Sequence, residues 1–172
     1  MLDVIARQPE FQTIFGKSLQ GAKLESLGII RSARLPVLGA IHDKLNQPIL
    51  LITEKGDRAL ELFDELSFWI PKQFIQLYPE PNPLFYEQAA WGPQTRRDRL
   101  QTLTKLSAYH ILGLEKPEIA PIIVASVRAL MARTLPRRDF IKVSKYIKVG
   151  QSIQMNALKQ HWVEIGYNFS DI

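Results

Sequence analysis

The apolar run at residues 48–53 constrains the fold more than any other feature of the sequence. It reads Pro-Ile-Leu-Leu-Ile-Thr, with no polar residue before the final threonine. A strand with one face in water alternates apolar with polar residues, whereas a strand buried on both faces does not. The run therefore predicts a strand of a parallel sheet that is covered on both faces.

The rest of the first 136 residues fits such a sheet. Helical periodicity and a break at Pro9 characterise residues 2–17, and residues 79–93 hold four of the eleven prolines, which favours a loop. Ser126 is suited to cap a short helix. The other predicted strands are residues 24–30, 74–78 and 121–125, and the predicted helices are 33–45, 54–68 and 95–109. Alternation of strands and helices predicts an α/β fold with a parallel, doubly wound sheet.

The stretch Gly-Ile-Ile-Arg-Ser-Ala-Arg-Leu at residues 28–35 lies where an ATP-binding α/β domain places its phosphate loop. Gly28 occupies the first glycine position of that motif. Ala33, Arg34 and Leu35 replace its second glycine, its lysine and its magnesium-binding hydroxyl. Leucine cannot bind Mg²⁺, so the pattern indicates a nucleotide-binding fold that has lost its nucleotide. The alternative is an ordinary strand–turn–helix that begins with glycine and carries an arginine.

Composition sets broad limits. The 172 residues are 46% hydrophobic and 23% charged, with a net charge of +5 and no cysteine. These values predict a globular chain without disulfides or thiolate metal sites, which fits a reducing cytoplasm. No apolar run is long enough to span a membrane, and the first residues do not resemble a signal peptide.

The pattern changes after residue 136, which we take as the end of the first domain. Residues 142–149 alternate basic with apolar side chains, which predicts a half-exposed strand. Residues 154–165 predict a helix with Gly166 at its C-terminal cap. One strand and one helix cannot close a core, so residues 137–172 are expected to be the opening of a small α+β domain or to dock wholly on the first.

Few residues suggest catalysis or metal binding. His42, His110 and His161 lie far apart and lack acidic companions at ligand spacing. Glu61, Asp64 and Glu65 are crowded on one predicted helix, where a solvated face is favoured over a pair of catalytic carboxylates. We therefore expect no catalytic residue, no metal and no cofactor.

Two basic groups are candidates for contact with nucleic acid or a protein partner. One opens a helix, and the other follows the first domain, offset by Asp139. Their alternatives are a solvated face or pairing with carboxylates of another domain. Phe85, Tyr86 and Trp91 of the proline-rich loop can stack on bases, but anchoring of the loop is favoured. The basic candidates are Arg96, Arg97 and Arg99, then Arg137, Arg138, Lys142, Lys145 and Lys148.

Three segments together carry a family resemblance. They are residues 77–100, with Leu-Tyr-Pro-Glu-Pro, Phe-Tyr-Glu and Arg-Arg-Asp-Arg-Leu; residues 122–130, Ile-Ile-Val-Ala-Ser-Val-Arg-Ala-Leu; and residues 148–167, from Lys-Val-Gly-Gln-Ser-Ile to Ile-Gly-Tyr. In this order the chain resembles the N-terminal module of the bacterial transcription-repair coupling factors (Mfd), which is homologous to the start of the excision-repair helicase UvrB.

The resemblance implies a vestigial ATPase-type scaffold in residues 1–136 and a truncated UvrB-like interaction domain in residues 137–172. ATP would be hydrolysed by motor domains of a longer DNA translocase, in transcription-coupled nucleotide excision repair. The resemblance implies the damage-sensing ATPase UvrA as partner, with Tyr167 and Asn168 on the docking surface and further residues beyond Ile172 needed for binding. DNA contact is a further expectation.

Two other functions stay open at this point. One is a nucleotide-binding piece of a UvrB-like helicase, and the other is a stand-alone nucleic-acid-binding module.

Overall fold

The computed structural model describes residues 1–21, 23, 28–81, 91–111 and 114–167. The chain divides into two compact units, Met1–Arg133 and Thr134–Ile172. The helices and strands of the first unit are α1 (Leu2–Ala6), α2 (Pro9–Leu19), α3 (Arg31–Leu45), β1 (Ile49–Thr53), α4 (Gly56–Leu66), the 3-10 helix η1 (Lys72–Phe74), β2 (Ile75–Tyr78), α5 (Pro93–Ser107), β3 (Ile122–Ser126) and α6 (Val127–Met131).

The described strands form one parallel sheet in the order β1-β3-β2. β3 comes last in the sequence but lies in the middle of the sheet. Helix α4 lies in the connection from β1 to β2, and α5 lies in the connection from β2 to β3. All five residues of β3 are buried. The α/β class and the parallel sheet predicted from the sequence are therefore confirmed.

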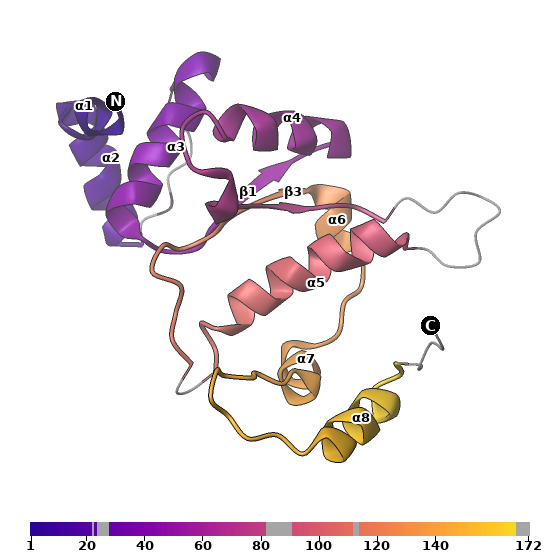
Figure 1. Cartoon of the computed structure of the whole chain (residues 1–172). Helices are drawn as coiled ribbons and strands as arrows, with labels where there is room; N and C mark the ends of the chain where they lie inside the picture. The colour runs from indigo at the N-terminus through magenta and orange to yellow at the C-terminus, as the bar shows by residue number, and fades with distance from the viewer. Residues whose placement is uncertain (22, 24–27, 82–90, 112–113, 168–172) are drawn as a thin grey trace. The chain divides into compact units, whose positions relative to one another are not determined.

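Helices cover both faces of β3 (Figure 1). Ile122 and Val124 pack with α4 and α3 on one face, and Ile123 and Ala125 pack with α5 and α6 on the other. Successive side chains of a strand point to opposite faces, so one five-residue strand contributes to two cores. A third cluster holds α1 and α2 against α3, with Phe11 and Ala40 at its centre.

Burial of β1 differs from the prediction. Ile49 and Leu51 pack against the core on the α4 side, but Leu50 and Ile52 are 48% and 52% exposed. The reason is position, because β1 is an edge strand and α5 packs against β2 at the other edge. The prediction that this strand is buried on both faces is wrong.

The end of the first expected strand also differs from the prediction. Residues 24–27 of the predicted strand 24–30 lie outside the described residues, and residues 28–30 have no regular structure. Helix α3 begins at Arg31, so Pro36 lies inside the helix rather than in its first turn.

The second unit contains α7 (Arg137–Val143) and α8 (Met155–Glu164). Residues 144–148 are irregular, so the strand predicted at 142–149 is wrong, and residues 134–167 contain no strand. Alternating side chains make a strand only where another strand pairs with it. Helix α8 ends as predicted, since Gly166 has φ +96° and the N–H groups of Gly166 and Tyr167 donate to Val163 and Trp162 carbonyls at 3.0 and 2.9 Å.

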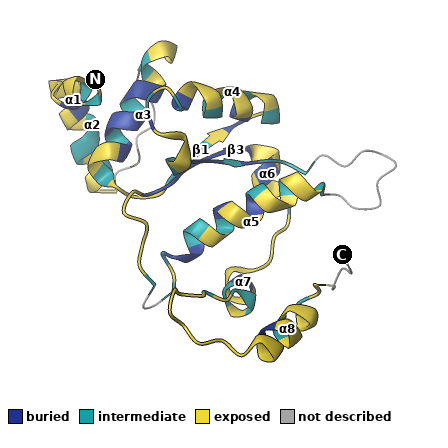
Figure 2. Ribbon diagram, in the orientation of Figure 1, coloured by how far each residue is buried: buried dark blue, intermediate teal, exposed yellow. Residues whose placement is uncertain are grey.

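The core of the second unit is small. Phe140 and Leu158 are its buried apolar side chains among the described residues, and most of α8 is exposed (Figure 2). The exposed apolar side chains include Leu135, Ile147, Val149, Met155, Val163 and Tyr167. Trp162 of α8 is 39% exposed.

The two faces of α4 give a direct test of the core. Leu66 is fully buried, whereas Leu60 on the same helix is 50% exposed. We predict that Leu66→Ala lowers the free energy of unfolding by about 3 kcal/mol, because it leaves a cavity under the sheet. Leu60→Ala should lower it by less than about 1 kcal/mol. Urea denaturation of both variants measures the difference, and equal losses would contradict this placement of α4.

Candidate functional site

The residues of the expected phosphate loop do not form a loop. Gly28 has φ +60° and precedes α3, while Ala33, Arg34 and Leu35 lie within the helix. Leu35 is 7% exposed and belongs to the core under the sheet. A phosphate loop needs successive backbone N–H groups turned toward one anion, and a helix directs most of them at its own carbonyls. Leu35, expected from the sequence at the magnesium-binding position, is therefore part of the core.

A second possible ligand site is the carboxyl end of the sheet, where α/β proteins bind their substrates. Thr53, Glu80 and Ser126 lie at or just after the ends of the three strands. The Ser126 hydroxyl donates to Glu80 Oε2 at 2.9 Å and accepts from the Ala129 N–H at 3.1 Å. Thr53 donates to the Lys55 carbonyl at 2.8 Å. Ser126 and Glu80 are therefore bonded to each other, and Thr53 is bonded to the backbone that follows it.

Glu80 also occupies the start of α4. A Cβ atom built on Gly56 would lie 3.0 Å from Glu80 Oε1, so the carboxylate rests against the first residue of that helix. Helix N-termini attract anions because their N–H groups and dipole are positive. Here the chain places its own carboxylate at the positive end of a helix.

Arg99 corrects one prediction of nucleic-acid contact. Its side chain is 2% exposed and reaches three backbone carbonyls, donating to Pro79 at 2.8 Å, Ala129 at 3.0 Å and Ala132 at 3.4 Å. The guanidinium also lies 4.0 Å from the ring centre of Tyr78 and 4.4 Å from that of Trp91. Arg99 thus joins β2, α5 and α6 inside the first unit and is not available to a phosphate.

The surroundings of Arg99 are unusual for a cation. Its partners are neutral carbonyls and aromatic faces, and its Nε has no hydrogen-bond partner. Burial lowers the pKa of the Arg99 guanidinium, and burial likewise raises the pKa of the Tyr78 phenol. The sequence carried a signal for this role, since Arg99 shares one stripe of α5 with Thr102, Leu103 and Leu106.

The remaining basic candidates lie on the surface. Arg96 and Arg97 of α5 are exposed. In the second unit, Arg137, Arg138 and Lys142 are exposed on α7, and Lys145 and Lys148 are exposed in the segment after it. Tyr167 is 62% exposed, and Asn168 lies outside the described residues.

Of the three aromatic candidates in the proline-rich loop, Trp91 lies among the described residues. Trp91 stacks on Arg99, in agreement with the prediction that it anchors its loop. Phe85 and Tyr86 lie outside the described residues. Trp69 packs against the core beneath the sheet.

The titratable side chains in the described ranges do not converge on a catalytic centre. Nε2 of buried His42 lies 2.6 Å from the Ala120 carbonyl, and His161 lies 3.3 Å from the Val143 carbonyl. Arg58 pairs with Glu61 at 2.6 Å and with Glu65 at 3.2 Å on an exposed helix face. Among the described residues, no three acidic, histidine or cysteine side chains lie close enough to hold a metal ion. Nor does any described helix have the length and apolarity needed to cross a membrane.

The role of Arg99 is tested by a pair of substitutions on one helix. Lysine has a single ammonium group and cannot bridge three carbonyls while stacking between two rings. We predict that Arg99→Lys lowers the free energy of unfolding by at least about 2 kcal/mol, because buried carbonyls lose their donor. Arg97→Lys, two residues earlier and exposed, should change it by less than about 0.5 kcal/mol. Urea titration followed by tryptophan fluorescence separates the two, and equal midpoints would refute the structural role.

Comparison with known proteins adds the family context. No model of a known protein family matches the chain. The transcription-repair-coupling factor of Bacillus subtilis is 31% identical over 170 residues, which are 98% of this chain and 14% of that protein. The transcription-repair-coupling factor of Myxococcus xanthus is 25% identical over 94% of this chain and 13% of its own length.

A second group of relatives is more distant. The UvrABC system protein B of Thermosipho africanus is 24% identical over 168 residues, which are 93% of this chain and 25% of that protein. The chain therefore spans a quarter or less of the length of these relatives. It is homologous to the N-terminal region of the transcription-repair coupling factors and of UvrB.

Proposed function

We propose that the chain is a non-catalytic scaffold and interaction module of a bacterial transcription-repair coupling factor, acting in the cytoplasm in transcription-coupled nucleotide excision repair. The observation that carries this proposal is the burial of Leu35 in the core, at the position where an active relative of this fold would hold its magnesium-binding hydroxyl. Homology to the coupling factors over 98% of the chain supplies the context.

The first unit is, in this proposal, an ATPase-type domain that has lost its nucleotide. Two features support the loss independently. Residues 31–35 are helical rather than a phosphate loop, and Glu80 rests against the start of α4. In such a protein ATP hydrolysis and DNA translocation belong to other domains of the longer relatives.

The second unit is proposed to open a UvrB-like interaction domain that contributes to docking UvrA. Exposed cations on and after α7 lie in the same small unit as exposed apolar side chains. Protein interfaces combine an apolar centre with a charged rim, so this composition suits a partner surface better than free solvent. Tyr167 and Asn168 belong to the proposed surface.

Two alternative functions can be distinguished from this one by experiment. A stand-alone nucleic-acid-binding module is favoured by the exposed Arg96 and Arg97 together with the basic residues of α7. Binding through several phosphate contacts would weaken steeply as salt rises. A nucleotide-binding helicase piece is favoured by the similarity to UvrB, and saturable ATP binding would support it.

We predict that the chain does not bind ATP in the presence of Mg²⁺. The reason is the missing hydroxyl at Leu35 and the helical backbone around it. Anisotropy of a fluorescent ATP analogue, titrated with the chain, measures binding directly. The Thermosipho africanus UvrB protein can be titrated beside it as a comparison. Saturation by the present chain in the micromolar range would contradict the proposal.

We predict that reversing the charge of the second unit weakens UvrA binding. Lys142→Glu, Lys145→Glu and Lys148→Glu combined should lower affinity roughly tenfold or more, because opposite charges across an interface then become like charges. Exposed Lys17→Glu on α2 is the matched control. Surface-plasmon resonance with immobilised UvrA measures the affinity of both variants. Both are made in the longest form of the protein that folds. Unchanged affinity of the triple variant would remove these residues from the docking surface.

A further inference from the structure

Strand β2 has an open edge that the proposed function does not use. It pairs with β3 on one side, and no described strand pairs with its other side. An unpaired strand edge presents backbone N–H and C=O groups in a row, which can template another strand. Native proteins commonly cover such edges with a helix, a proline or a lysine. An edge that stays open inside a groove is therefore a candidate binding site for another strand.

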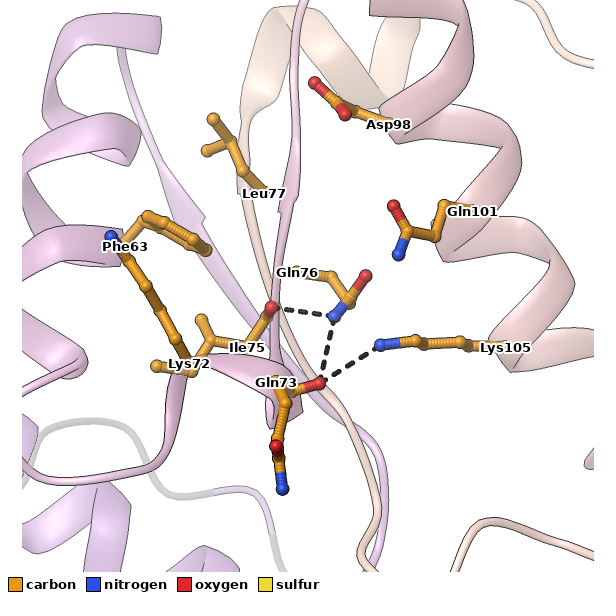
Figure 3. A pocket seen from close by; sticks show the side chains of 9 residues that line it. All are labelled: Phe63, Lys72, Gln73, Ile75, Gln76, Leu77, Asp98, Gln101 and Lys105. Atoms are coloured by element: carbon orange, nitrogen blue, oxygen red, sulfur yellow. Dashed lines mark hydrogen bonds between the residues drawn. The ribbon is translucent and has the colours of Figure 1, made fainter.

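The edge of β2 forms the floor of a groove between two helices. Figure 3 looks onto this groove, with Phe63 of α4 and Lys72 of η1 on one side and Asp98, Gln101 and Lys105 of α5 on the other. Its volume is about 550 Å³, within the range of ligand-binding clefts.

The two sides of the groove differ in chemistry. Ile75 and Leu77 pack against the core on the α4 side. Gln76, between them in sequence, lies on the α5 side, where its amide donates to the carbonyls of Ile75 at 2.7 Å and Gln73 at 3.5 Å (Figure 3). An extended segment laid along β2 would meet an apolar wall with one set of side chains and a polar wall with the other.

The charges of the groove favour an acidic occupant. Lys105 Nζ donates to the Gln73 carbonyl at 3.1 Å, a neutral partner, and burial lowers the pKa of Lys105. Lys72 Nζ lies 5.4 Å from the ring centre of Phe63 and 3.7 Å from the exposed carboxylate of Asp64. The carboxylate that lines the groove, Asp98, accepts a hydrogen bond from Gln94 at 2.7 Å.

We infer that this groove binds an extended acidic segment of a partner protein, which adds as a strand along the open edge of β2 and places a carboxylate against Lys105. Main-chain hydrogen bonds to the edge provide affinity, and the alternating side chains provide selectivity. This surface belongs to the first unit, so the inference does not rest on docking of UvrA by the second.

The geometry favours protein over nucleic acid. Nucleic-acid affinity comes mainly from many cations that neutralise successive phosphates. The groove offers two cations, Lys72 and Lys105, which are too few to neutralise a run of successive phosphates. A four-residue strand edge, by contrast, matches the backbone of a short extended peptide.

The test is a selection of peptides that bind the 172-residue chain. Random peptides of about ten residues, displayed on phage, should yield binders in which Asp or Glu alternates with β-branched residues. A selected peptide is then made in its free form and in a form with alternate backbone amides methylated. Because methylation removes the donors that pair with a strand edge, the methylated form should bind at least roughly tenfold more weakly.

Variants of one residue separate charge from folding. Lys105→Gln should weaken the selected peptide roughly tenfold, whereas Lys105→Arg should keep its affinity within about threefold. Lys17→Gln, at an exposed position, is the control and should leave the affinity for the peptide unchanged. Circular dichroism confirms that each variant is folded.

Any of four outcomes of the peptide experiments would overturn the inference. They are selection that yields no binders, selection without acidic enrichment, binding that does not depend on Lys105, and equal binding of the methylated peptide. A mixed-sequence single-stranded DNA that binds with the same dependence on Lys105 would also overturn it, since the groove would then be a nucleic-acid contact.

Discussion

The first unit depends on the burial of one short strand. All five residues of β3 are buried, and both other described strands pair with it. Its alternating side chains divide between the core that holds α3 and α4 and the core that holds α5 and α6. Its last residue, Ser126, caps α6 and bonds Glu80. The two helical layers and the carboxyl end of the sheet therefore all depend on β3. A destabilising substitution in β3 would affect each of them.

Local sequence predicted most of the regular elements, because their signals are local. Apolar runs marked β1, β2 and β3, helical periodicity marked α3, α4, α5 and α8, and Gly166 marked the end of α8 through its left-handed backbone. What local patterns could not provide is the order of strands. The run at β1 is as apolar as that at β3, yet Leu50 and Ile52 are half exposed because β1 lies at an edge.

The candidate site was predictable in part. The sequence placed an apolar Leu35 at the expected magnesium-binding position, but only the structure shows that Leu35 is part of the core. Arg99 was grouped with Arg96 and Arg97 by sequence proximity, although its place on the stripe of α5 signalled that it faces inward. Only the fold shows which carbonyls of two other elements it reaches. The closure of the carboxyl edge by Glu80 depends on residues from three separate segments, a relation that no single segment encodes.

We propose that the positions where nucleotide-binding relatives of this α/β fold hold their ligand serve a structural role in this chain. Hydrogen–deuterium exchange with and without saturating Mg-ATP tests it at the level of individual peptides. The account predicts unchanged exchange at residues 28–35 and at the start of α4, because Leu35 is in the core and Glu80 rests against Gly56. Slower exchange at those two places in the presence of Mg-ATP would contradict the account.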